Sequence, residues 1–115
     1  MTSLLTSTMT SIELGGWTEA QDATEETQKI CDQVKHQVEE KTGKNYVEYR
    51  AIEYRNQLEN GETFLIKVHV GGTDYIHLRV LQIIPLVRGV PSPKDFLQGV
   101  EQHKTKDDPL VPFTN

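Results

Sequence analysis

The hydrophobic periodicity of the chain changes once, from a helical repeat to a strand repeat, and this change limits what the chain can fold into. In residues 24–42 the apolar positions Ile30, Val34 and Val38 recur every fourth residue, which places them on one face of a helix. Thr24 is a suitable N-cap at the start, and a glycine follows the last residue. The pattern predicts a single amphipathic helix that must lie on another apolar surface.

From Asn45 onward apolar and polar residues alternate, as in strands buried on one face. Turn signals at 59–61 and 71–74 separate three such runs, which cover residues 47–54, 64–70 and 76–80. The phase of the first run reverses at Ala51–Ile52, which indicates a bulge or a strong bend. Short links force an antiparallel meander, and the helix covers its apolar face, so we expect an α+β domain.

Composition excludes several classes of protein. The 115 residues fit one domain, and a net charge of −5 argues against a nucleic-acid partner. No apolar run approaches the roughly 18–20 residues that a membrane span needs. The start of the chain is rich in Ser and Thr and has no basic residue before Lys29, so we interpret residues 1–13 as a flexible tail of a cytoplasmic protein and residues 14–115 as the domain. All five prolines lie between positions 85 and 112, which predicts a loop-rich last quarter.

The residues that carry chemistry predict neither catalysis nor metal binding. Cys31 lies in the middle of the helix beside Asp32, where a thiolate is disfavoured, so we interpret it as a small core hydrophobe. His69 and His77 have no cysteine or carboxylate at ligand spacing, which makes a poor zinc site. We expect both histidines, with Lys67 and Arg79, to lie on a solvated face of the sheet. No cofactor is expected.

Apolar residues occur at three places where polar ones are expected. Leu14 and Trp17 flank Gly15 and Gly16 ahead of any predicted element, and residues 83–87 form a second patch at a strand end. The turn at 57–61, polar apart from Leu58, is a third candidate. Consecutive apolar residues at loop tips are typical of contact surfaces or of buried plugs. Trp17 fits either interpretation, as an anchor for a partner or as a ring folded back on the domain.

At these places the sequence resembles the stefins, the intracellular single-domain members of the cystatin family. The resemblance extends from Leu14 to Phe113. The matching segments are Gly15–Gly16 for the N-terminal glycine motif, residues 23–41 for the helix, residues 57–61 for the Gln-x-Val-x-Gly hairpin, residues 64–71 and 76–80 for two strands, Ile84–Pro85 for the second hairpin, and residues 104–108 with Phe113 for the tail.

The resemblance implies a curved antiparallel sheet of four to five strands wrapped around one long helix. It also implies a reversible, competitive inhibitor of papain-like cysteine proteases of the cathepsin B, H and L type. In stefins the N-terminal segment and two hairpins form a wedge that fills the active-site cleft. Carried over to this chain, the protease-binding residues are Leu14, Gly15, Gly16, Gln57, Leu58, Glu59, Asn60, Gly61, Ile84 and Pro85.

The first hairpin departs from the family pattern, because Glu59 replaces its central apolar residue. A carboxylate forced into a dry cleft costs of order 1–3 kcal/mol, which would weaken inhibition roughly 10- to 100-fold. The alternative reading is therefore a stefin fold that no longer inhibits and serves as a protein-binding module. We expect a monomer, and the short-turn hairpins also allow a domain-swapped dimer.

Overall fold

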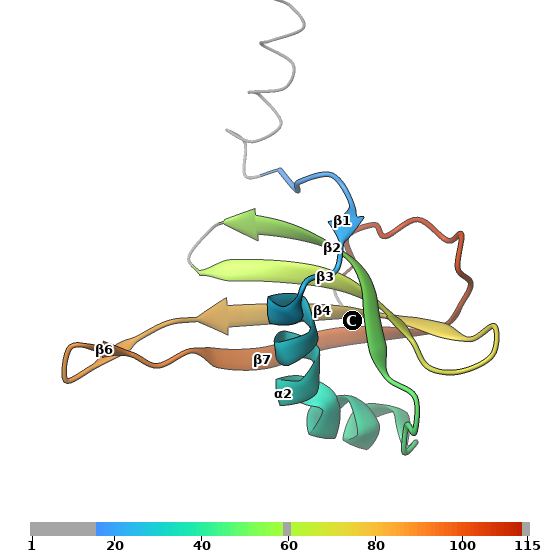
Figure 1. Cartoon of the computed structure of the whole chain (residues 1–115), viewed down its shortest axis with the longest axis horizontal. Helices are drawn as coiled ribbons and strands as arrows, with labels where there is room; N and C mark the ends of the chain where they lie inside the picture. The colour runs from blue at the N-terminus through green and yellow to red at the C-terminus, as the bar shows by residue number, and fades with distance from the viewer. Residues whose placement is uncertain (1–15, 59–60, 114–115) are drawn as a thin grey trace, which may run out of the picture.

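One helix lies across one face of a five-stranded antiparallel sheet in the computed structural model, which describes residues 16–58 and 61–113 (Figure 1). The strand order in the sheet is β1-β2-β3-β4-β7, and β5 and β6 form a separate two-stranded hairpin. This arrangement confirms the α+β prediction. The elements are β1 (Gln21–Asp22), α2 (Glu25–Thr42), β2 (Arg50–Leu58), β3 (Glu62–His69), β4 (Tyr75–Ile83), β5 (Leu86–Val87), β6 (Val90–Pro91) and β7 (Lys94–Lys104).

Helix α2 has the bounds that its capping residues predict. The Thr27 backbone N–H donates to the Thr24 hydroxyl at 3.3 Å, and the Thr24 N–H donates to the Thr27 hydroxyl at 3.0 Å. Gly43 ends the helix in the left-handed region, at a φ of 73°, and donates its N–H to the Glu39 carbonyl. A residue with a Cβ is strained in that conformation, which is why the helix stops at the glycine.

The core lies between the apolar face of α2 and the two central strands. Val34, Val38 and Cys31 are completely buried. They pack against alternate residues of β3 and β4. The helix therefore contributes about every fourth residue, and each strand contributes every second residue, to the same interface. The residues that β3 and β4 contribute to this core are Phe64, Ile66, Val68, Ile76, Leu78 and Val80.

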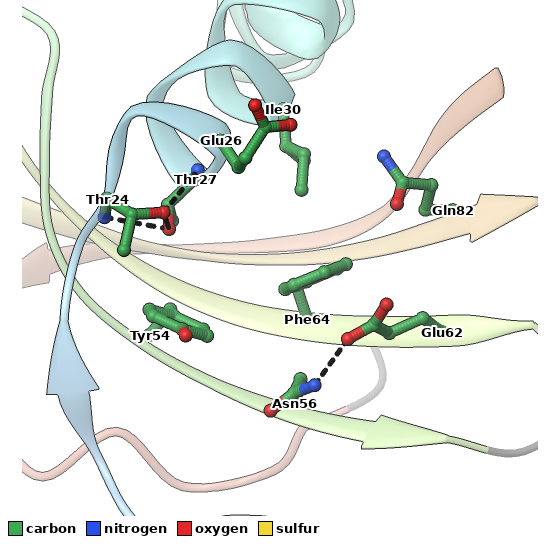
Figure 2. Close-up of a pocket in the computed structure, with 9 residues that line it drawn as sticks. All are labelled: Thr24, Glu26, Thr27, Ile30, Tyr54, Asn56, Glu62, Phe64 and Gln82. Atoms are coloured by element: carbon green, nitrogen blue, oxygen red, sulfur yellow. Dashed lines mark hydrogen bonds between the residues drawn. The ribbon is translucent and has the colours of Figure 1, made fainter. Parts of the chain in front are cut away.

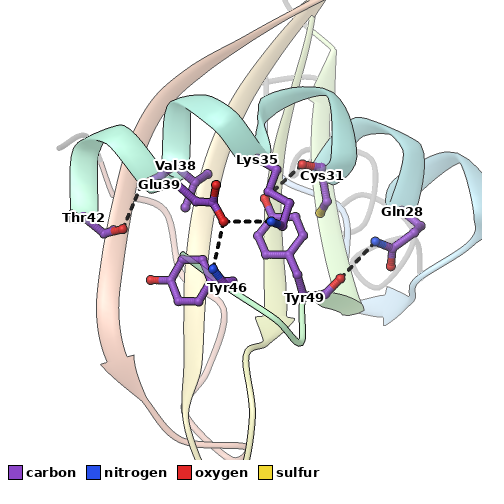
Figure 3. Close-up of polar contacts among 8 residues, drawn as sticks. All are labelled: Gln28, Cys31, Lys35, Val38, Glu39, Thr42, Tyr46 and Tyr49. Carbon is purple, nitrogen blue, oxygen red and sulfur yellow. Dashed lines mark hydrogen bonds and ion pairs between the residues drawn. The ribbon is translucent and has the colours of Figure 1, made fainter. Parts of the chain in front are cut away.

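The connection between α2 and β2 runs back along the helix and is fixed by polar contacts (Figure 3). The Tyr46 backbone N–H donates to the Glu39 carboxylate at 2.8 Å, and the Tyr49 hydroxyl donates to the Cys31 carbonyl at 2.9 Å. The strand predicted from residue 47 therefore begins only at Arg50, and Val47 is fully exposed. The predicted irregularity is confirmed, because the register of β2 against β3 shifts between Ala51 and Glu53.

The last quarter of the chain is more regular than its prolines predict. Residues 94–104 form β7, an 11-residue strand that pairs with β4 and has two register shifts. The loop-rich prediction is wrong here because the prolines, at positions 85, 91, 93, 109 and 112, flank this strand without interrupting it.

The C-terminal segment, residues 105–113, covers the face of the sheet opposite the helix. Three side chains of the sheet donate hydrogen bonds to backbone carbonyls of this segment. Lys67 donates to the Lys106 carbonyl at 2.6 Å, Arg55 to the Leu110 carbonyl at 2.7 Å, and Arg79 to the Phe113 carbonyl at 2.8 Å. The prediction of a solvated face is therefore wrong for His77, which is 0% exposed, and for Lys67, which is 4% exposed. His69 and Arg79 are half-buried.

Candidate functional site

Two chain reversals lie side by side at one edge of the molecule, which we call the hairpin edge: the first joins the end of β2 at Leu58 to the start of β3 at Glu62, and the second is residues 84–93, between β4 and β7 (Figure 1). The strand register explains why the two reversals lie close together, since Leu58 pairs with Glu62 and Glu62 pairs with Gln82. A Cβ on Gly61 would lie 3.1 Å from the Gln82 carbonyl oxygen. Gly61 therefore lets the first reversal pass close to the end of β4.

The second reversal is a paired hairpin that projects beyond the ends of the neighbouring strands (Figure 1). Val87 of β5 pairs with Val90 of β6, and the Ser92 N–H donates to the Pro85 carbonyl at 2.9 Å. The predicted apolar surface is confirmed at both reversals. Its exposed residues are Leu58 at 75%, Ile84 at 53%, Leu86 at 69%, Val87 at 53% and Val90 at 61%.

The N-terminal segment, residues 16–20, runs beside the end of β2 toward the hairpin edge. The Thr18 N–H donates to the Asn56 carbonyl at 2.9 Å, and the Asn56 N–H donates to the Thr18 hydroxyl at 3.0 Å. Because β1 pairs antiparallel with β2, the chain before Thr18 continues toward Leu58. Gly16 is half-buried on this path. The described part of the N-terminal segment thus runs toward the edge that carries the two reversals.

Four of the predicted site residues lie outside the described residues: Leu14, Gly15, Glu59 and Asn60. Trp17, which fitted two interpretations, folds back on the domain. Its ring is half-buried and lies 5.4 Å from the guanidinium carbon of Arg79, a distance typical of a cation–π contact.

Sequence reasoning missed the residues that hold the N-terminal segment in place. Arg55 donates from Nε to the Thr18 carbonyl at 2.8 Å and from its terminal nitrogen to the Leu110 carbonyl at 2.7 Å. One guanidinium thus links both terminal segments to β2. In the sequence Arg55 is an ordinary charged residue of an alternating strand, with no local signal for this role.

A hollow of about 330 Å³ lies behind the hairpin edge, between the first turn of α2 and the sheet (Figure 2). The rings of Tyr54 and Phe64 form its floor. Glu62, on its wall, accepts a hydrogen bond from the Asn56 side chain, and Glu26 lies on the opposite wall. Among the described residues that line the hollow there is no histidine or cysteine, and its two threonine hydroxyl groups, on Thr24 and Thr27, bond to each other.

The groups considered for chemistry are arranged as structural residues. Cys31 is completely buried in the core, which confirms the interpretation as a core hydrophobe. Burial, and after it the charge of Asp32, raises the pKa of its thiol far above the usual range. Within residues 16–58 and 61–113, no three His, Cys, Asp or Glu side chains are placed to share a metal ion. In the same ranges no helix has both the length and the hydrophobicity needed to cross a membrane.

Comparison with known proteins decides the family. Residues 15–107 match the model of the cystatin domain. The chain belongs to the cystatin family. It is 46% identical over 99 residues to Cystatin-A1 of Sus scrofa, covering 86% of this chain and 92% of that protein. Over 101 residues it is also 46% identical to Leukocyte cysteine proteinase inhibitor 1 of Sus scrofa, with the same coverage of both chains.

A less similar relative matches a slightly longer part of the chain. This cystatin is 40% identical over 103 residues to Cystatin-B of Oplegnathus fasciatus, covering 90% of this chain and 99% of that protein. The resemblance to stefins is confirmed. The helix, the sheet and the hairpin edge described above therefore form a stefin-type fold.

Proposed function

We propose that this cystatin is a reversible, competitive inhibitor of papain-like cysteine proteases that inserts the hairpin edge into the active-site cleft. One observation supports the proposal: the N-terminal segment, bound at Thr18 to Asn56, runs toward the edge of the fold where the two hairpins expose apolar residues. A relative that is 46% identical bears the name of a cysteine proteinase inhibitor, which supports the same activity.

In this proposal the N-terminal residues act at the catalytic centre. Leu14 fills an apolar substrate pocket, and Gly15 and Gly16 let the backbone pass close to the catalytic thiol and turn away. A chain that turns away presents no carbonyl in near-attack geometry, so the inhibitor is not cleaved. Thr18, held by Asn56 and Arg55, sets the direction in which this segment leaves the domain.

The two hairpins occupy the other half of the cleft. Gln57, Leu58 and Gly61 contribute from the first, and Ile84 and Pro85 from the second. The second reversal is already paired in the free chain, through Val87 and Val90. A preformed hairpin loses little conformational entropy on docking, which favours tight binding.

The proposed partners are cathepsins of the B, H and L type, met by a monomer in the cytoplasm. Residues 1–13 are a tail outside the inhibitory domain, residues 14–115, and the chain has no catalytic activity of its own. A reducing compartment agrees with one buried, unpaired thiol at Cys31.

The test is a progress-curve titration of papain and cathepsins B, H and L with the full chain. We expect inhibition at nanomolar concentration. Gly15→Trp and deletion of residues 1–15 should each weaken it, whereas Ala20→Trp, at an exposed position of the same segment, should not. Absence of inhibition at tens of micromolar by the folded protein contradicts the proposal, and unchanged inhibition by both N-terminal variants contradicts the role of Leu14 and Gly15.

Glu59 and Asn60 form the tip of the first hairpin in this proposal, and Glu59 is its weakest point. The relatives' names give no support to the alternative of a non-inhibitory module, so we treat Glu59 as a residue that lowers affinity. Glu59→Val should strengthen inhibition roughly 10- to 100-fold, the reverse of the desolvation cost of a buried carboxylate. Glu40→Val, on an exposed part of the helix, is the control. Equal affinities of wild type and Glu59→Val would mean that the carboxylate reaches water or a basic group.

A further inference from the structure

An arginine occupies the tip of the second hairpin in a backbone conformation that arginine rarely adopts. Arg88 and Gly89 are the two residues between β5 and β6, with φ values of 55° and 79°. Positive φ at both central residues is the pattern of a type I′ turn, which strongly favours Asn-Gly or Gly-Gly. A long side chain in the left-handed region strains the backbone. Hairpin formation alone therefore does not explain an arginine at this position.

Arg88 is an isolated positive charge in this part of the sequence. It is the only charged residue from position 81 to position 93, in a chain whose net charge is −5. It is exposed, and so are its neighbours Val87 and Val90 on the paired strands. Figure 1 shows that this tip is the part of the hairpin farthest from the sheet. The other reversal carries one acidic residue in its sequence, Glu59, so the two hairpins have opposite charge.

We propose that Arg88 determines which proteases this inhibitor prefers, by pairing with carboxylates that lie on the target just outside the cleft. Val87 and Val90 then contact the adjacent apolar surface, while the ion pair stays at the solvated perimeter of the interface. This inference rests on the proposed function and names the chemistry of the partner, a cysteine protease with an acidic surface beside the half of the cleft that the second hairpin enters. A protease with a basic surface at that place should bind less tightly, because like charges at an interface repel each other.

The location of the charge predicts how it acts. An exposed charge at the perimeter of an interface mainly accelerates association and loses influence as salt screens it, with a Debye length of about 10 Å at 0.1 M. The tip projects from the fold, so its charge meets the target before the hairpin edge is fully inserted. We therefore expect Arg88 to affect the association rate constant more than the dissociation rate constant.

The test uses Arg88→Asn and Arg88→Glu in the full chain, with Lys44→Asn and Lys44→Glu as matched controls. Asn suits the type I′ turn, so Arg88→Asn keeps the hairpin, and its unfolding midpoint should not fall below that of wild type. Lys44 is an exposed cation that follows the far end of α2. Inhibition constants and association rates are measured against papain and cathepsins B, H and L in low salt and in 0.5 M salt.

For the protease that wild type inhibits most tightly in low salt, we expect about fivefold weaker inhibition by Arg88→Asn and about thirtyfold by Arg88→Glu, and less than twofold changes for the Lys44 variants. High salt should reduce the Arg88 effects. Effects below twofold, effects matched by Lys44, or effects that persist in high salt would each overturn the proposal. If wild type inhibits none of the four enzymes, the proposed function fails first, and this inference fails with it.

Discussion

Acid should destabilise this cystatin through one buried histidine. His77 is 0% exposed, and neither ring nitrogen has a hydrogen-bond partner among the described residues. Burial, and after it the charges of Lys104 and Lys67, lowers the pKa of His77 from 6.5 to about 4, against an opposing effect of Asp108. Because the neutral ring is favoured in the fold, the unfolded chain binds a proton that the folded chain does not. Stability is therefore lost as the pH falls from about 6.5 to about 4, by roughly 3 kcal/mol in total.

The measurement is urea denaturation of wild type and His77→Leu at intervals between pH 7.5 and pH 4. Carboxylates titrate in both proteins, so the difference between the two curves isolates His77. We expect His77→Leu to be the more stable protein at pH 7, because it removes an unpaired buried polar group, and to gain a further margin of roughly 3 kcal/mol on acidification. His103→Asn, which removes an exposed histidine in the left-handed region, is the control variant. Parallel curves for wild type and His77→Leu would refute the reasoning.

Three further predictions test the fold and the hairpin edge. Gly61→Ala should lower the free energy of unfolding by about 1–3 kcal/mol, because φ is 112° and the new Cβ would lie 3.1 Å from the Gln82 carbonyl oxygen; an unchanged urea midpoint would contradict this. Gln28→Ala should cost about 1–2 kcal/mol, because its side chain bonds two backbone groups next to β2, whereas Gln33→Ala on the exposed helix face should cost less than about 0.5 kcal/mol. Cys31 should react with a disulfide reagent only as fast as the protein opens, as its full burial requires; rapid labelling of the native protein would exclude the structural role.

The parts of the fold that depend on local patterns could be predicted from the sequence. The bounds of α2 follow from Thr24 and Gly43, because capping acts within one turn. The bulge after Ala51 follows from a reversal in alternation, because each strand residue faces opposite its neighbour. The predicted start of β2 is too early because Val47, Tyr49 and Ala51 alternate with polar residues as in a strand, whereas Tyr46 and Tyr49 bond to the helix.

The covered second face of the sheet could not be predicted from the sequence. Lys67, His77 and Arg79 alternate with core residues, which is the normal pattern of a strand with one wet face. Residues 105–113 cover this face and accept hydrogen bonds from Lys67 and Arg79, and the Lys67–Lys106 bond spans 39 positions of the sequence. Nothing in the sequence of residues 105–113 indicates that they bind side chains of the distant strands. The apolar residues of the candidate site could therefore be predicted from the sequence, whereas the arginines that hold its N-terminal segment in place could not.

The C-terminal segment connects stability with the proposed inhibition. Arg55 bonds the Leu110 carbonyl and the Thr18 carbonyl with one guanidinium, and Arg79 bonds the Phe113 carbonyl while it lies against the ring of Trp17. The segment that covers His77 therefore also fixes the two arginines that orient the N-terminal segment. Any change that releases residues 105–113 removes one hydrogen bond from each guanidinium group, so that Arg55 and Arg79 hold the N-terminal segment less firmly in its direction toward the hairpin edge. Loss of the C-terminal segment should weaken inhibition even though none of its residues belongs to the proposed contact surface.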